Sequence, residues 1–230
     1  MIMNPQLLAA VKTYQMPPEG EQLLKQHPPL IIAGIAASGK NAVFNYLIEH
    51  GGWRRIITHT TRPPRAGEVN GKDYWFVTED EMLDLLKQKI FLETEVIHET
   101  RVHGVSLKAY RAATDQKNRP IILLDVQGVL KFARYTPGLK AVFILPPNRK
   151  AWLSRLQKRG PASDEEKVRR ARSAVKEIQV VLDNPRLFNL VVNEEIWQVA
   201  SEILTDHPDA AKQAGYRQIA LALQEQIRSG

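Results

Sequence analysis

Short runs of apolar residues, each bounded by turn residues, recur along the chain. Their hydrophobicity is continuous rather than alternating, which is typical of strands buried on both faces of a parallel sheet. Amphipathic stretches with helical periodicity lie between or after these runs. The predicted strands cover residues 30–35, 121–126, 140–145 and 189–192, and the predicted helices cover residues 41–50, 127–135, 148–159, 164–183 and 195–206. This alternation predicts an α/β fold, with an open parallel sheet that has helices on both sides.

Residues 54–110 interrupt the alternation. The pattern in this segment predicts strands at residues 54–60 and 73–77, a helix at 78–89, and a hairpin formed by 91–97 and 101–105. We interpret the segment as a small insertion at the carboxyl edge of the sheet, where open α/β sheets bind their ligands. Outside the sheet region, helices are expected at residues 4–16, 21–26 and 208–230.

The first predicted strand leads into a loop of pattern G-x-x-x-x-G-K and then into a predicted helix. The loop comprises Gly34, Ile35, Ala36, Ala37, Ser38, Gly39 and Lys40, with Asn41 next. In such a loop the backbone N–H groups converge on a polyphosphate, the helix N-terminus adds its dipole, and the lysine reaches the outer phosphates. Asn41 stands where the pattern normally has a Ser or Thr hydroxyl that binds Mg²⁺. An ordinary glycine turn is the alternative, but the strand before it and the helix after it favour a phosphate-binding loop.

Composition excludes several classes of protein. The 230 residues are 43% hydrophobic, which is enough for one sizeable core. There is no cysteine, so neither disulfides nor thiolate metal sites can form, and a reducing compartment is expected. The sequence has no signal-peptide pattern and no apolar stretch near the roughly 20 residues that span a bilayer. We therefore expect a cytoplasmic protein that does not bind membranes.

The formal net charge of +7 has two interpretations. A basic protein can bind nucleic acid, but the arginine clusters lack the interleaved series of aromatic residues that would form a stacking platform for bases. A positive surface around a small polyanionic substrate explains the excess equally well. We expect no nucleic-acid partner and keep nucleic-acid binding as the alternative.

The polar loop at residues 60–77 resembles the nucleotide-binding segment of guanylate kinases. Further matches to this family occur in order at residues 125–128, 143–147, 155–160 and 191–193. The resemblance covers residues 29–205 and implies a P-loop core with an acceptor-nucleotide insertion at 58–108 and a lid at 159–168. It leaves helical extensions at 1–28 and 206–230.

The resemblance also implies roles for individual residues. Arg62, Arg65 and Tyr74 match the clamp on the monophosphate of the acceptor, and Glu93 matches the carboxylate that accepts hydrogen bonds from guanine. The remaining acceptor-site positions are Thr58, His103, Val105 and Asp125. The catalytic positions are Lys40, Arg65, Arg159 and Arg170, the last two being lid arginines that neutralise charge on the ATP phosphates. Asn193 matches a position near adenine, whereas Arg155, Arg169 and Arg172 are candidates for plain surface charge.

Some positions depart from the family pattern. His103 replaces a phosphate-contacting tyrosine, and Leu123 replaces an acidic residue. Val105 replaces a hydroxyl that meets the guanine oxygen, and Ser106 is the alternative source of that hydroxyl. Asn41 is expected to bind Mg²⁺ through its amide oxygen or through a water molecule. These changes affect the choice of base more than the binding of phosphate.

The expected activity is an ATP:GMP phosphotransferase, which forms ADP and GDP with Mg²⁺ as cofactor. ATP and GMP are the expected partners, and the chain is expected to be a monomer or a homodimer. One alternative is a kinase of the same fold that acts on another phosphorylated acceptor, such as a ribose bisphosphate. Another is a catalytically silent binding module, but such a module has no need of Lys40 or of the lid arginines.

Overall fold

The computed structural model describes residues 3–97, 100–114, 119–158, 163–205 and 209–229. The chain forms two compact units, which we treat separately. The first comprises Met1–Pro29, Trp53–Ile122 and Leu130–Pro137, and the second comprises Leu30–Gly52, Leu123–Val129 and Gly138–Gly230.

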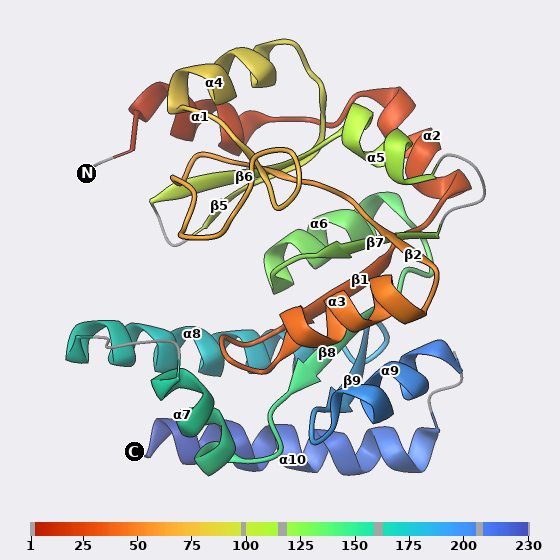
Figure 1. The fold of residues 1–230 in the computed structure, drawn as a ribbon, viewed down its shortest axis with the longest axis vertical. Coiled ribbons are helices and arrows are strands. Elements are labelled where there is room, and N and C mark those ends of the chain that lie inside the picture. Colours follow the sequence, from red (N-terminus) through yellow and green to blue (C-terminus); the bar gives the residue numbers. More distant parts are fainter. Residues whose placement is uncertain (1–2, 98–99, 115–118, 159–162, 206–208, 230) are drawn as a thin grey trace. The chain divides into compact units, whose positions relative to one another are not determined.

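The second unit is built on parallel strands (Figure 1). Strand β8 (Ala141–Leu145) lies between β1 (Leu30–Gly34) and β9 (Phe188–Val192), and most residues of all three strands are buried. Buried strands of this kind require helices as cover. The helices of this unit are α3 (Lys40–His50), α7 (Arg149–Gln157), α8 (Asp164–Asp183), α9 (Ile196–Leu204) and α10 (Ala210–Arg228). Helix α3 packs against β1 and α9, and α10 packs against α8 and β9.

The first unit contains a parallel pair of strands and a separate mixed sheet. Strand β2 (Trp53–Arg55) pairs with β7 (Arg119–Leu123). The mixed sheet has the order β4 (Trp75–Phe76), β3 (His59–Thr60), β6 (Arg101–Ser106), β5 (Phe91–Ile97). The helices are α1 (Pro5–Thr13), α2 (Pro18–Gln26), α4 (Glu79–Lys87) and α5 (Leu107–Thr114), and α6 (Val126–Tyr135) ends in this unit.

Helices α1 and α4 bury one face of the mixed sheet. Their apolar residues form a core with two strand residues, and the cluster consists of Met3, Leu7, Val11, Met82, Leu86, Phe91 and Val102. The hydroxyl of Tyr14, just after α1, donates to the carbonyl of Phe91 at 2.8 Å and accepts from its N–H at 2.9 Å. The N-terminal helix is therefore part of this unit's core.

The expected α/β class is confirmed, with parallel strands and flanking helices. The single strand expected at residues 54–60 is wrong, because this stretch serves two sheets. The N–H of Ile56 bonds to the carbonyl of Ile121 at 3.0 Å and completes the pairing of β2, after which the chain enters β3. The strand expected at 121–126 ends at Leu123, and Asp125 instead accepts a hydrogen bond from the N–H of Gly128 at the start of α6. Helix α5 was not predicted.

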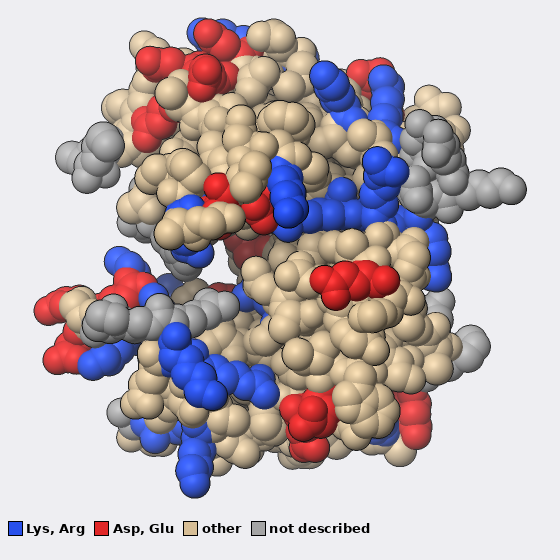
Figure 2. Space-filling view, viewed as in Figure 1, with Lys and Arg blue, Asp and Glu red and all other residues tan. Residues whose placement is uncertain are grey.

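Lys and Arg side chains form several separate groups on the face shown in Figure 2, and Asp and Glu side chains lie between some of them. No helix in the described parts of the chain is both long enough and apolar enough to cross a membrane.

Candidate functional site

The glycine-rich loop joins β1 to α3 in the second unit. Gly39 has φ +91° and is the N-cap of α3, and a Cβ atom there would lie 2.1 Å from Nδ2 of Asn193. Only glycine fits both this backbone angle and this close approach. No side chain among the described residues caps the N-terminus of α3, so its first N–H groups and its dipole are directed to whatever anion binds there.

Helix α7 and Asn193 hold the loop from outside. The carbonyl of Ser38 accepts hydrogen bonds from Arg155 at 3.0 Å and from the side-chain amide of Asn193 at 2.9 Å. Arg155 also donates to the Asn193 carbonyl at 2.8 Å, and Nε1 of Trp152 donates to the carbonyl of Ala36 at 2.8 Å. Arg155 is therefore a support of the loop, which corrects its interpretation as surface charge. Asn193, expected near adenine, is 3% exposed and uses its amide on the loop.

Lys40 is the first residue of α3 and lies among carboxylates. Its Nζ donates to the carbonyl of Ile35 at 3.2 Å. Glu177 of α8 accepts a hydrogen bond from Ser173 at 2.7 Å. Burial raises the pKa of Glu177, while the charge of Lys40 lowers it and that of Asp125 raises it, so all three groups are close enough to interact. Sequence reasoning missed Glu177, although its spacing from Ser173 on an amphipathic helix was a usable signal.

Asn41 offers one amide oxygen that could bind a metal ion. Asn41 is exposed in the first turn of α3. Among the described residues there is no group of three or more His, Cys, Asp or Glu that could hold a metal. Mg²⁺ commonly keeps several waters and takes few protein ligands next to bound phosphates, so a single amide oxygen suits it.

Of the two arginines expected in a lid, Arg170 lies in α8 and Arg159 lies outside the described residues. Arg170 donates from Nε to Glu166 at 2.8 Å, and Arg169 also pairs with Glu166. The lid expected at 159–168 is described only from residue 163 onward, where Ser163 caps the N-terminus of α8.

In the first unit, the pairing of β5 with β6 places several expected residues on one face. Glu93 lies opposite Val105, and Glu95 lies opposite His103. Directly opposed residues of antiparallel strands point to the same side, so these four share a face. A register shift between Phe91 and Glu93 lets Phe91 remain in the core beneath α1 and α4. Glu93 is only 6% exposed, which is unusual for a charged side chain.

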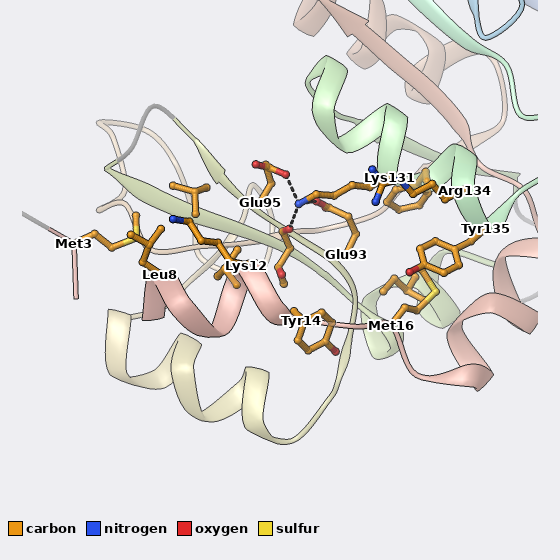
Figure 3. Close-up of a pocket in the computed structure, with 15 residues that line it drawn as sticks. Met3, Leu8, Lys12, Tyr14, Met16, Glu93, Glu95, Lys131, Arg134 and Tyr135 are labelled. Atoms are coloured by element: carbon orange, nitrogen blue, oxygen red, sulfur yellow. Dashed lines mark hydrogen bonds and ion pairs between the residues drawn. The ribbon is translucent and has the colours of Figure 1, made fainter. Parts of the chain in front are cut away.

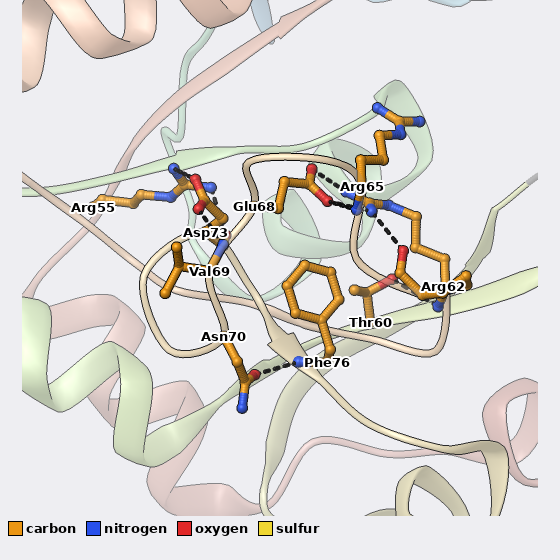
Figure 4. A network of polar contacts seen from close by, with 10 residues as sticks. Arg55, Thr60, Arg62, Arg65, Glu68, Val69, Asn70, Asp73 and Phe76 are labelled. Atoms are coloured by element: carbon orange, nitrogen blue, oxygen red, sulfur yellow. Dashed lines mark hydrogen bonds and ion pairs between the residues drawn. The ribbon is translucent and has the colours of Figure 1, made fainter.

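Arg62 belongs to a polar network in the loop after β3 (Figure 4). Its guanidinium forms a bidentate pair with Glu68, each N–O distance being 2.6 Å, and lies 4.9 Å from the centre of the Tyr74 ring. The hydrogen bonds from Arg62 lower the pKa of Glu68 to about 2. The ring of Tyr74 also meets His103 edge-on, with 5.6 Å between the ring centres. The structure thus gathers Arg62, Tyr74 and His103, and it adds Glu68, which sequence reasoning did not use.

The remaining acceptor positions are more scattered. Arg65 donates its backbone N–H to Glu68 at 2.7 Å, and the residue is exposed. Thr58 is half-buried, and its carbonyl accepts from the N–H of Trp75 at 2.9 Å. Asp125 lies in the unit that contains the loop, where it interacts with Glu177.

Comparison with known proteins points to one family. Residues 26–207 match the family model described as guanylate kinase. The chain is 31% identical over 180 residues to the guanylate kinase of Caldanaerobacter subterraneus subsp. tengcongensis, covering 78% of this chain and 85% of the relative. It is 34% identical over 176 residues to that of Neisseria gonorrhoeae, covering 76% and 83%. A crystal structure of guanylate kinase from Anaplasma phagocytophilum is similar with a TM-score of 0.59 and 26% identity, covering 86% of this chain and 95% of that one.

Proposed function

The chain belongs to the guanylate kinase family, and from this we propose that it transfers the γ-phosphoryl group of ATP to GMP, which yields ADP and GDP. It is an ATP:GMP phosphotransferase, a nucleoside monophosphate kinase. The observation that carries the proposal is the supported Gly34–Lys40 loop, whose helix N-terminus no described side chain caps.

In the proposed reaction the second unit binds ATP. The N–H groups of the loop and of the first turn of α3 hold the phosphates, and Lys40 contributes a full positive charge to the outer ones. Arg155 and Asn193 keep the Ser38 peptide in place. Phosphoryl transfer requires little covalent chemistry from a protein. The rate enhancement therefore comes from the positioning of the reactants and from positive charge near the phosphates. Arg170 and Arg159 are the proposed lid cations.

The first unit binds GMP in this proposal. Arg62, Arg65 and Tyr74 hold the phosphate of GMP, because two guanidinium groups suit a dianion and never lose their protons. Glu68 now pairs with Arg62. The phosphate of GMP either displaces the Glu68 carboxylate from the guanidinium of Arg62 or shares that guanidinium with it. Glu93 accepts hydrogen bonds from N1–H and N2–H₂ of guanine. Adenine has no donor at N1, so it would leave the Glu93 carboxylate poorly paired and is rejected.

Mg²⁺ is the proposed cofactor, and it would enter with ATP. Asn41 would bind it directly or through water. When bound, the ion offsets negative charge on the phosphates of ATP. The division into an acceptor insertion at 58–108 and a lid at 159–168 is part of the proposal. Cytoplasmic location and a monomeric or dimeric state stay predictions.

Substitution of Lys40 tests the proposal. Lys40→Ala removes the charge on the outer phosphates, so we expect kcat for ADP release with GMP to fall by about two orders of magnitude or more. Lys87→Ala is the matched control, because Lys87 is exposed and pairs only with Asp84 among the described residues. If Lys40→Ala turns over at the wild-type rate while remaining folded, the loop is not the ATP site.

A further inference from the structure

Lys131 reaches from α6 to the face of β5 that carries Glu93 (Figure 3). Its Nζ donates to the carbonyl of Thr94 at 2.7 Å and forms an ion pair with Glu95. The same Nζ lies 3.9 Å from Oε1 of Glu93. One ammonium group is thus fixed beside the carboxylate to which guanine recognition is assigned.

Two carboxylates on one face of a strand repel each other, and burial makes this repulsion larger. Glu93 and Glu95 are such a pair, with side chains that are 5% and 21% exposed. The ammonium group of Lys131 offsets this negative charge, and an ionised carboxylate can only accept hydrogen bonds. Compensation of this charge is the first role that the geometry gives the lysine.

A second role follows from the number of its donors. An ammonium group has three N–H donors, and the Thr94 carbonyl and Glu95 take two of them. The distance of 3.9 Å to Glu93 is that of an ion pair rather than a hydrogen bond. The third N–H is therefore placed to meet an acceptor on a ligand that binds Glu93. The residue opposite Glu93 on β6 is Val105, whose side chain has no donor to offer.

We propose that Lys131 reads guanine together with Glu93. Guanine presents an acceptor, O6, next to two donors, N1–H and N2–H₂. An ammonium beside a carboxylate is complementary to this edge: Lys131 donates to O6 while Glu93 accepts from the two nitrogens. The inference rests on the proposed function and names a residue that selects its base.

Glu93 and Lys131 also line a cavity of about 630 Å³, together with Glu95, Arg134, Tyr135 and residues from the N-terminal segment. Arg62 and Tyr74 are not part of its lining, so the cavity shows that the two side chains are accessible rather than where the phosphate of GMP lies. Its volume is in the range of small-molecule sites. The side chain of Lys131 is 35% exposed, so a base can reach it while α6 and β5 stay folded.

The test compares GMP with 6-thio-GMP, in which sulfur, a weaker acceptor, replaces O6. We expect the wild type to prefer GMP in kcat/KM by about tenfold or more, the effect of one charge-assisted hydrogen bond. Lys131→Met should raise KM for GMP by about the same factor and remove most of this preference, with KM for ATP unchanged. Lys131→Arg keeps charge and donors and should retain part of it. Lys87→Met, on α4, is the control for removing a lysine.

The outcomes separate the roles. If Lys131→Met raises KM equally for GMP and 6-thio-GMP, the lysine only compensates charge and the proposal is overturned. A wild type that uses both nucleotides equally overturns it as well, and this result does not depend on any variant folding. If the wild type transfers phosphate to neither nucleotide but accepts another acceptor, the proposed function itself has failed.

Discussion

Single residues in the two proposed nucleotide sites already have protein partners, which bound ligands would replace or join. Arg62 is the clearest case, because both of its terminal nitrogens bond to Glu68. If the phosphate of the acceptor binds this guanidinium, it replaces the Glu68 carboxylate. Arg62 would then keep a negatively charged partner throughout. The pair fixes the orientation of the guanidinium at the proposed phosphate site.

This pair makes stability depend on pH in a defined direction. The pKa of Glu68 falls from 4.5 to about 2 in the folded protein. Its contribution is therefore complete above about pH 4.5 and is lost as pH falls toward 2. Glu68→Gln should lower the free energy of unfolding at neutral pH by about 1–2 kcal/mol, a figure reduced for solvent screening.

Urea unfolding at several pH values checks this, and the difference between Glu68→Gln and wild type should shrink as pH falls from about 4.5 to about 2. Glu21→Gln is the control, since Glu21 forms an exposed pair with Lys25 and should change stability by less than about 0.5 kcal/mol. A difference that does not vary with pH would mean that Glu68 is not ionised against Arg62.

Asn41 allows a second prediction at this scale. If its amide oxygen orients Mg²⁺ or a water on it, Asn41→Thr should be tolerated and Asn41→Leu should raise the Mg²⁺ concentration needed for half-maximal activity, by about threefold or more. Activity measured across a Mg²⁺ titration gives the result. Equal titration curves for the wild type and both variants would place the metal on other groups.

At the scale of elements, sequence reasoning could predict local patterns but not contacts between residues far apart in the sequence. The strand–loop–helix pattern around Lys40 is local, and residues 30–50 fold as it predicts. Arg155 and Asn193 bond to Ser38 across 117 and 155 residues. No periodicity encodes such contacts, so Arg155 was interpreted as surface charge. Glu68 and Lys131 were missed because their value depends on which side chain the fold places opposite them.

Helix α7 should therefore affect ATP binding without touching the nucleotide. Arg155→Met leaves the Ser38 and Asn193 carbonyls without their charged donor, so KM for ATP should rise by about tenfold and stability should fall by about 1–3 kcal/mol. Steady-state kinetics with ATP and GMP varied separately gives the first value, and urea unfolding gives the second. Lys150→Met, an exposed change on the same helix, is the control, and identical kinetics for the two variants would remove Arg155 from the loop's support.

At the scale of the whole molecule, the chain outside the P-loop core is integrated into its two units. Helix α1 supplies part of the core under the mixed sheet, and α10 packs on α8 and β9. Sequence reasoning predicted these helices but left their contacts open, because an amphipathic stretch does not say which surface it covers. The α/β class was easier to predict, since it follows from local patterns, and the acceptor insertion at 58–108 stays a prediction.

Tyr14 tests whether the N-terminal segment stabilises the first unit. Tyr14→Phe removes both hydrogen bonds to the backbone of Phe91, and leaving these groups unpaired should cost about 1–3 kcal/mol. Thermal or urea unfolding measures the loss. Tyr46→Phe, in the second unit, is the matched control and should be nearly neutral. Equal stability of Tyr14→Phe and wild type would show that the segment is only loosely attached.

The account's central claim is that this chain phosphorylates GMP. The most direct measurement is ADP release by the wild-type protein with ATP and Mg²⁺, across GMP, dGMP, AMP, CMP, UMP and a ribose bisphosphate. We predict the highest kcat/KM with GMP, and values at least about a hundredfold lower with AMP and the pyrimidine nucleotides, because Glu93 needs the donors of guanine. Comparable use of AMP, or faster transfer to the ribose bisphosphate than to GMP, would contradict the account.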